Sequence, residues 1–140
     1  MFSQTGNVHL YFDAACSGKL DADNSLQFRK QESVQIDEIM QYERFGWSTS
    51  ACDVNLDGFK DAIVCAPSFG GVNVSAVVGN YSGRCDVFLG PFKPYSGALE
   101  PDASIYGDRD WGLFGYAVIA ADIDVDGKTD LVISAPSAGR

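Results

Sequence analysis

Short apolar runs separated by turn residues are the first pattern along the chain. Residues 62–65 and 131–134 are rich in β-branched side chains, and each run lies between an Asp/Gly-rich stretch and an Ala-Pro pair. Residues 8–10 and 85–87 alternate apolar with polar positions. Runs of this length and composition are typical of β-strands. The pattern therefore predicts an all-β fold in which a strand, a nine-residue loop, a strand and a longer connection follow one another.

The chain also repeats itself. Residues 44–67 align with residues 113–136 without a gap, and both copies carry a Phe-Gly pair, an aspartate-rich loop and an Ala-Pro pair. A second, looser echo relates residues 6–12 to residues 83–89. Self-similarity of this kind indicates stacked units, each of which cannot bury its apolar face alone. We therefore expect two related β-units in contact, preceded by the end of another.

Each repeat contains one aspartate-rich loop. Its oxygen-bearing side chains stand at alternating positions before a glycine, and a further aspartate follows three residues after that glycine. This spacing gathers hard oxygen ligands on one side of a tight turn, as Ca²⁺ requires, and a backbone carbonyl at the seventh position adds another. The predicted ligands are Asp53, Asn55, Asp57, Phe59 and Asp61 in loop 53–61, and Asp122, Asp124, Asp126, Lys128 and Asp130 in loop 122–130.

The alternative for these loops is a pair of metal-free turns, because Asp and Gly favour turns in any case. Against it, seven of the fifteen aspartates of the chain fall in the two loops, where they would repel one another without a cation. An EF-hand is excluded, since its twelfth position would be Val64 or Ile133 in an apolar run instead of glutamate. The sequence favours two Ca²⁺ sites.

Charge and length exclude several classes of function. The 140 residues include 10 Lys and Arg against 19 Asp and Glu, a net charge of -9, which argues against a nucleic-acid partner. His9 is the single histidine, so neither a His-based zinc centre nor a Ser/His/Asp triad can form. No apolar run is long enough to span a membrane, and residues 1–6 do not begin a signal peptide.

The four cysteines show no C-x-x-C spacing, which argues against a zinc ribbon, and they allow three disulfide connectivities. If Asp53 faces Asp61 across the hairpin, Cys52 faces Ala62 and Cys65 faces Thr49. A Cys52–Cys65 bridge is then out of register, and a bridge from Cys65 to Cys85 on the neighbouring strand is favoured. Asn73 and Asn80 each begin an N-glycosylation sequon, to be used if the chain is secreted.

Taken in order, the Phe-Gly pair, the aspartate loop, the Ala-Pro pair and the Gly-x-Val-x-Val-Phe-like strand resemble the FG-GAP repeat. This repeat forms β-propeller blades in integrin α-subunits and in glycosylphosphatidylinositol-specific phospholipase D. The resemblance implies an incomplete β-propeller of about two blades of antiparallel strands, with Ca²⁺ in both loops. One departure is that Cys65 and Ser134 stand where the family usually has glycine, which affects local packing more than the fold.

The resemblance also divides the chain. Residues 1–15 would end a preceding blade, 16–43 would form a connection, 44–90 a blade, 91–112 a second connection and 113–140 the first half of the next blade. Because propellers typically close with 4–8 blades, we expect a fragment that needs the remaining blades of its parent chain and that aggregates or folds loosely when expressed alone.

The function implied is a calcium-binding extracellular module, secreted or on the cell surface. It would not be catalytic by itself, and it would present a surface to a protein or to a glycolipid-anchored ligand. The parent would be a secreted phospholipase D-type hydrolase or, as the alternative, an integrin α-like adhesion head. Catalysis by the segment itself is disfavoured for two reasons. The aspartate-rich loop recurs in two copies, and in each copy all of its acidic side chains would bind a single ion.

Overall fold

The fold is built from short β-strands. The structure is a computed structural model that describes residues 6, 8–11, 25–28, 43–70, 80–93 and 99–139. Within these ranges the chain forms strands and no helix, so no helix there is long or apolar enough to cross a membrane. The strands are β1 (Val8–Tyr11), β2 (Ser25–Phe28), β3 (Ser48–Cys52), β4 (Asp61–Ala66), β5 (Arg84–Phe88), β6 (Ala103–Tyr106), β7 (Val118–Ala121) and β8 (Asp130–Ile133).

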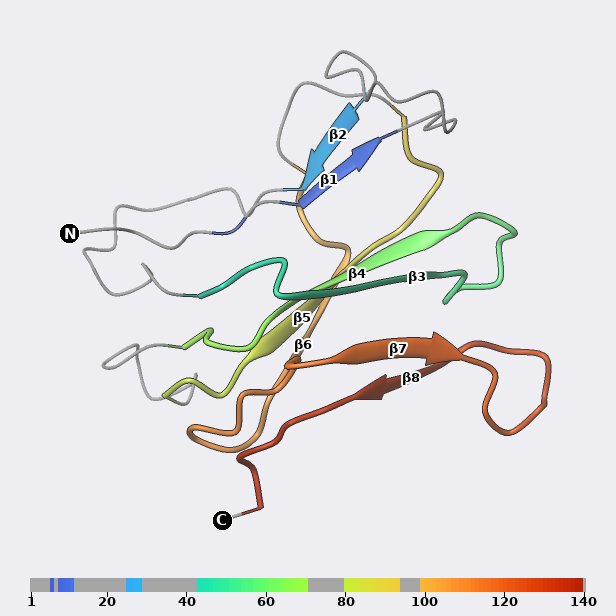
Figure 1. The fold of residues 1–140 in the computed structure, drawn as a ribbon. Coiled ribbons are helices and arrows are strands. Elements are labelled where there is room, and N and C mark those ends of the chain that lie inside the picture. The colour runs from blue at the N-terminus through green and yellow to red at the C-terminus, as the bar shows by residue number, and fades with distance from the viewer. Residues whose placement is uncertain are drawn as a thin grey trace.

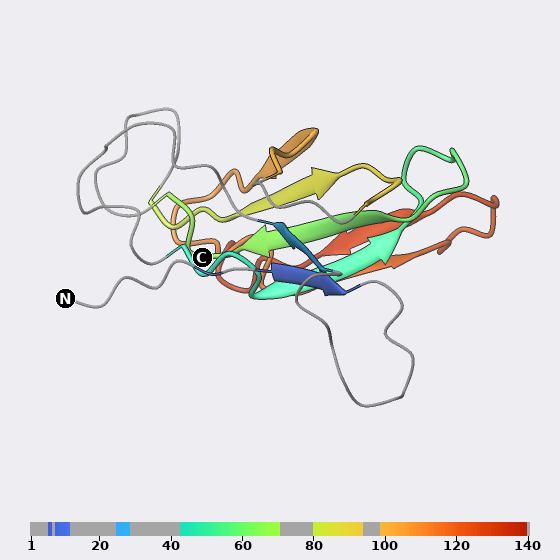
Figure 2. The same cartoon turned by 90° about the horizontal axis from the view of Figure 1, so that it is seen from above.

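Three antiparallel sheets are arranged in layers. The central sheet has the order β3-β4-β5-β6, while β1 pairs with β2 and β7 pairs with β8. The central sheet lies between the two hairpins (Figures 1 and 2). The expected all-β class is confirmed, and the layering of antiparallel sheets is consistent with neighbouring blades of a partial propeller.

Alternate side chains of the central sheet serve two separate cores. Val64, Ala66 and Phe88 face the β1 side, where Val8 and Leu10 pack against them. The opposite face carries Ile63, Cys65, Cys85 and Val87. Val118 of β7 covers this second face, with Phe114, Ala120, Leu131 and Ile133 around it. Because strand side chains alternate between faces, one sheet can contact a neighbour on each side, as a stacked repeat requires.

A close backbone approach joins each Phe-Gly pair to the unit before it. A Cβ atom built on Gly83 would collide with the backbone of Phe114, and one built on Gly6 would collide with that of Phe45. Gly83 and Phe114 also form an isolated parallel bridge. The two contacts are equivalent in the repeat, which explains why residues 6–12 and 83–89 resemble each other.

The register of the first hairpin differs by one residue from our expectation. Cys52 pairs with Asp61, and Cys65 pairs with Ser48, so the expected partners Ala62 and Thr49 are wrong. The reason lies in the loop, because Asp53 does not pair across the hairpin. Its carboxylate instead accepts hydrogen bonds from the loop backbone, as described below. The conclusion that Cys52 and Cys65 cannot bridge directly still holds.

Two strands lie in segments that were expected to be connections. β2 falls within 16–43 and pairs with β1, and β6 falls within 91–112 and pairs with β5 as the fourth strand of the central sheet. β6 is only four residues long, and three of these are exposed at the sheet edge. A short edge strand buries too little to show the apolar alternation that identifies a strand in the sequence.

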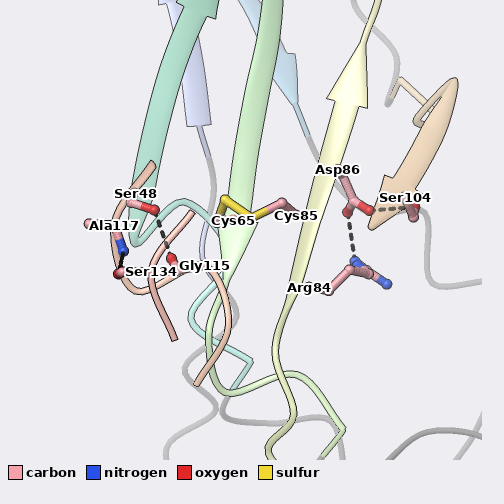
Figure 3. The surroundings of a disulfide bond; sticks show 9 residues. All are labelled: Ser48, Cys65, Arg84, Cys85, Asp86, Ser104, Gly115, Ala117 and Ser134. Carbon is pink, nitrogen blue, oxygen red and sulfur yellow. Dashed lines mark hydrogen bonds and ion pairs between the residues drawn. A yellow bond between two sulfur atoms is a disulfide. The ribbon is translucent and has the colours of Figure 1, made fainter. Parts of the chain in front are cut away.

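The Cys65–Cys85 disulfide is present, which confirms the pairing favoured from the sequence. The two cysteines are opposite each other on β4 and β5, and neither is exposed to solvent. Cys52 is a buried free thiol, and Cys16 lies outside the described residues. Figure 3 shows the disulfide beside Gly115, whose carbonyl accepts a hydrogen bond from Ser48 Oγ at 2.8 Å.

Candidate metal-binding loops

The two aspartate-rich loops lie at the same end of the molecule. Loop 53–61 connects β3 to β4, and loop 122–130 connects β7 to β8. Both views of the ribbon show the two loops extending from their hairpins in the same direction (Figures 1 and 2). Since β3 and β7 are in contact, the repeat places the two candidate sites on neighbouring layers.

The first loop is closed by its own carboxylates. The Asp53 carboxylate accepts hydrogen bonds from the backbone amides of Asp57 at 3.1 Å and Gly58 at 2.9 Å. The Asn55 side-chain oxygen also accepts from the Asp57 amide, and Asp57 Oδ1 accepts from the Phe59 amide at 2.8 Å. In a turn of this kind, short polar side chains accept hydrogen bonds from backbone amides a few residues ahead. These bonds replace the backbone hydrogen bonds that pair the two strands.

The second loop repeats this network bond for bond. Asp122 accepts from the amides of Asp126 at 3.0 Å and Gly127 at 2.9 Å. Asp124 accepts from the same Asp126 amide, and Asp126 Oδ1 accepts from the Lys128 amide at 2.8 Å. The two loops therefore share one backbone conformation, although Asn55 and Asp124 differ at the third position.

Each loop contains a left-handed residue that is not glycine. Leu56 has φ 60° and Val125 has φ 63°, and both are followed one residue later by an aspartate and then by a left-handed glycine. A β-branched residue such as Val125 rarely adopts this region, because its Cβ approaches the backbone. The hydrogen bonds from loop amides to the Asp53 and Asp122 carboxylates hold this conformation.

Three carboxylates of the second loop converge. One oxygen from each of Asp122, Asp124 and Asp130 lies within 4.8 Å of the others. Oxygens at this spacing suit a hard divalent cation, and Ca²⁺ takes six to eight such ligands. In the first loop Asn55 stands at the position of Asp124, so the matching group contains two carboxylates and one amide oxygen. The donor set of both loops fits Ca²⁺.

Asp126 is engaged elsewhere in the second loop. Its Oδ2 lies 2.8 Å from the Lys128 ammonium, and this hydrogen bond, together with that from the Lys128 amide, holds the pKa of Asp126 below its ordinary value. In the first loop the corresponding Asp57 Oδ2 accepts a hydrogen bond from the Asn55 amide group at 2.9 Å. To bind a cation through Oδ2, Asp126 would have to give up its hydrogen bond from Lys128, and Asp57 would have to give up its hydrogen bond from Asn55.

Asp61 has a role that sequence reasoning did not identify. Its side chain is fully buried, and it accepts from the Val54 amide at 2.7 Å and from the Gly90 amide at 2.8 Å. It therefore ties the loop to the segment that follows β5. Asp130 makes the first of these contacts, to the Ile123 amide at 2.8 Å, and it is only half-buried. The ninth-position carboxylate of each loop thus helps to hold the loop backbone, and in the second loop it also belongs to the convergent cluster.

The thiol of Cys52 lies directly before the first loop. Burial raises its pKa, and the negative charge of Asp61, its partner across the hairpin, raises it further. A thiol in this environment stays protonated and behaves as a small apolar side chain. The structure therefore offers no reason to count Cys52 among the ligands.

A buried ion pair lies on the face of the central sheet opposite the disulfide. Arg84 Nη2 lies 2.8 Å from Asp86 Oδ2, and Ser104 Oγ donates to Asp86 Oδ1 at 2.6 Å (Figure 3). The guanidinium also stacks on Phe69, 4.2 Å from the ring centre. These residues link β5 to the edge strand β6, and nothing in the sequence pattern marked them as a pair.

Of the two sequons, only Asn80 can be placed, because Asn73 lies outside the described residues. Asn80 is half-exposed; its amide donates to Asp110 at 3.1 Å, and its carbonyl accepts from the Trp111 amide at 2.6 Å. Ser82, which completes this sequon, is buried. Glycosylation at either position stays a prediction.

Comparison with known proteins agrees with the repeat. The FG-GAP repeat family model matches residues 114–140. Phosphatidylinositol-glycan-specific phospholipase D from Bos taurus is 38% identical over 104 residues, covering 70% of this chain and 12% of the relative. The Homo sapiens enzyme of that name is 36% identical over the same span, and integrin alpha pat-2 from Caenorhabditis elegans is 34% identical over 101 residues, or 68% of this chain and 8% of the relative.

The chain thus spans about one eighth of the length of its phospholipase relatives, and a smaller share of the integrin. The matched repeat begins at Phe114, the residue that contacts Gly83 of the preceding sheet, and it contains the whole of loop 122–130. Two kinds of relative, a phospholipase and an integrin, share the same repeated unit with this chain. The chain belongs to the FG-GAP repeat family.

Proposed function

We propose that the chain is a calcium-binding, extracellular FG-GAP module that is not catalytic by itself. The observation that carries this proposal is the convergence of Asp122, Asp124 and Asp130 within a loop whose hydrogen-bond network recurs in the first repeat. Two copies of one preorganised oxygen cradle suit a structural ion, because a catalytic centre is usually single. The partners we propose are the other blades of the parent chain and a protein or glycolipid-anchored ligand.

The two sites would use the residues at loop positions one, three, five, seven and nine. The seventh position would contribute the backbone carbonyl of Phe59 in the first loop and of Lys128 in the second. A bound Ca²⁺ supplies positive charge that offsets the repulsion between the carboxylates. The second loop brings one more carboxylate than the first, and we expect it to bind the ion more tightly.

The blade division follows the repeat, with the added strand included. We propose that β1 and β2 end a preceding blade, that residues 44–106 form one blade through β6, and that residues 113–140 begin the next. The segment 107–112 connects the last two units. This division keeps β3 and β7 at equivalent positions, each directly after its Phe-Gly pair.

The parent we propose is a phosphatidylinositol-glycan-specific phospholipase D-like protein, supported by the 38% identity to the bovine enzyme over most of this chain. An integrin α-like parent is the second candidate, supported by the 34% identity to integrin alpha pat-2 over a similar span. In either case the module lies outside the cell. The buried Cys65–Cys85 disulfide supports that location, because disulfides persist in oxidising compartments.

Calcium titration tests the loops. At a free concentration ten times the Kd, Ca²⁺ is expected to raise the free energy of unfolding by about 1.4 kcal/mol per site, because it binds the folded loop only. Calorimetric titration of the full chain should show two binding events. Asp122→Ala is expected to abolish the tighter one, since Asp122 both faces the cluster and caps two loop amides.

The matched control is Asp108→Ala, which removes the same charge from a highly exposed position outside both loops. It should leave both binding events in place. Identical titrations for Asp122→Ala and the unchanged chain would sink the assignment of the second loop. Equal losses in both variants would mean that net charge, and not the loop, attracts the ion.

A hydrolysis assay tests the absence of catalysis. The purified chain, with and without Ca²⁺, is expected to release no product from a phosphatidylinositol-glycan substrate, because its clustered aspartates serve two repeated loops and its single histidine, His9, lies on β1. The full-length bovine enzyme serves as the positive control. Turnover that is lost in the Asp122→Ala variant would overturn the non-catalytic proposal while leaving metal binding intact as a separate question.

A further inference from the structure

The Cys65–Cys85 disulfide lies where the second repeat rests on the first. Both cysteines are completely buried, in the core that β7 covers. Gly115 of the second Phe-Gly pair lies directly over the bridge: a Cβ atom built there would be 2.8 Å from Cys65 Cβ and 2.9 Å from Cys85 Sγ (Figure 3). The backbone of the second repeat therefore occupies the space next to the sulfur of the first.

Gly115 is held over the disulfide from several directions. Ser48 Oγ donates to its carbonyl at 2.8 Å, and its own amide donates to the Ser134 carbonyl at 3.0 Å. The amide of the preceding residue, Phe114, donates to the Ser82 carbonyl at 2.9 Å. The first and third of these bonds join the two repeats. The backbone at Phe114 and Gly115 cannot move away from the disulfide unless the second repeat separates from the first.

We propose that docking of the second repeat gates the reduction of Cys65–Cys85, which makes this disulfide a redox-sensitive joint between the repeats. Thiol–disulfide exchange requires a thiolate to reach one of the sulfur atoms. In the docked state neither sulfur is accessible, so a reductant can react only with molecules in which the β7–β8 hairpin has lifted. The rate of reduction then follows the population of this open form.

The exchange balances with a small dithiol as reductant. One of its thiolates attacks Cys65 or Cys85, forming a mixed disulfide and releasing the other cysteine as a thiolate that takes up a proton. The second thiol of the reductant loses its proton and displaces the protein sulfur, which is protonated in turn. The reductant ends as a cyclic disulfide, and the two electrons it has given up leave two cysteine thiols on the protein.

The coupling also acts in the opposite direction. Two separate thiols need more room than a bonded pair, and the backbone of Gly115 already fills the space beside Cys85 Sγ. Reduction should therefore weaken the contact and favour the undocked hairpin. If reduction weakens docking in this way, reciprocity at equilibrium requires that docking favour the disulfide over the two thiols to the same extent. None of the residues at this contact is a proposed metal ligand, so the contact is independent of calcium binding.

The test is the rate at which the full chain loses this disulfide in a dithiol at pH 8, followed by alkylation and mass analysis of the peptides that contain Cys65 and Cys85. Ser48→Ala removes one hydrogen bond between the repeats and is expected to speed reduction about fivefold. Gly115→Ala places a methyl group against Cys65 Cβ and Cys85 Sγ and should speed reduction at least tenfold. Gly139→Ala is the control, because a Cβ at that position meets no atom within 4 Å.

Equal reduction rates for the unchanged chain, Ser48→Ala and Gly115→Ala would overturn the proposal. Gly115→Ala could also fail to fold, which circular dichroism would reveal; Ser48→Ala then decides, since it introduces no backbone strain.

A second readout follows the contact between Trp47 and Tyr116, whose ring centres lie 5.6 Å apart across the two repeats. In a Trp111→Phe background Trp47 is the single tryptophan, and reduction should change its emission. Emission that is unchanged by complete reduction contradicts the coupling.

Discussion

Replacing Ile63 with alanine is expected to lower the free energy of unfolding by about 4 kcal/mol, because its side chain is fully buried beneath the second repeat and leaves a cavity there. Val132 occupies the equivalent position of the second repeat but is 48% exposed. Val132→Ala should therefore cost about 1 kcal/mol or less. Urea unfolding of both variants at one protein concentration gives the comparison.

The difference between these two variants measures what a following unit contributes. Ile63 lies in the core that Val118 of β7 covers, whereas the equivalent Val132 of β8 is about half exposed. Similar losses at both positions would contradict this view, because they would mean that burial within a single hairpin accounts for the effect. A loss at Ile63 alone supports the docking of repeats as the main source of apolar burial on this face.

Removing the disulfide with Cys65→Ala and Cys85→Ala together is expected to cost about 3 kcal/mol of stability. The bridge closes a stretch with a sequence separation of 20, and the loss of that constraint in the unfolded chain gives this magnitude. Cys52→Ala is the control, because it also truncates a buried cysteine of the same core without opening a bridge. Thermal and urea unfolding under non-reducing conditions would measure the two costs.

A double variant that is no less stable than Cys52→Ala would show that the cross-strand bridge adds nothing beyond its packing. Such a result would also conflict with a joint role for the bridge, since a disulfide without influence on stability could not affect docking. The two stability predictions are independent of Ca²⁺, and both can be measured in the presence of a chelator.

The central hairpins could be predicted because the repeat gives two views of the same unit. Residues 62–65 fall on β4 and residues 131–133 on β8. The favoured Cys65–Cys85 bridge follows from placing residues 83–89 on the neighbouring strand. The register was harder to predict. Whether Asp53 pairs across the hairpin or caps the loop depends on hydrogen bonds that composition does not show, and an error of one residue results.

Part of the candidate site could likewise be predicted from the sequence, and part of it could not. The spacing of the aspartates predicted the loops, and the structure places Asp122, Asp124 and Asp130 together, although metal binding itself stays a prediction. The sequence did not reveal that Lys128 holds Asp126 or that Asp61 is buried against Gly90. Both features depend on side-chain direction and on the strand that follows, which a local motif does not contain.

The contact between Gly83 and Phe114, repeated by Gly6 and Phe45, has a consequence for how such chains can vary in length. The glycine and the phenylalanine are separated by 31 positions in one case and by 39 in the other, yet the contact is the same. By chain statistics, closing the longer segment costs only about 0.2 kcal/mol more. Insertions between these two anchors are thus nearly neutral, whereas the anchors themselves tolerate no side chain on the glycine.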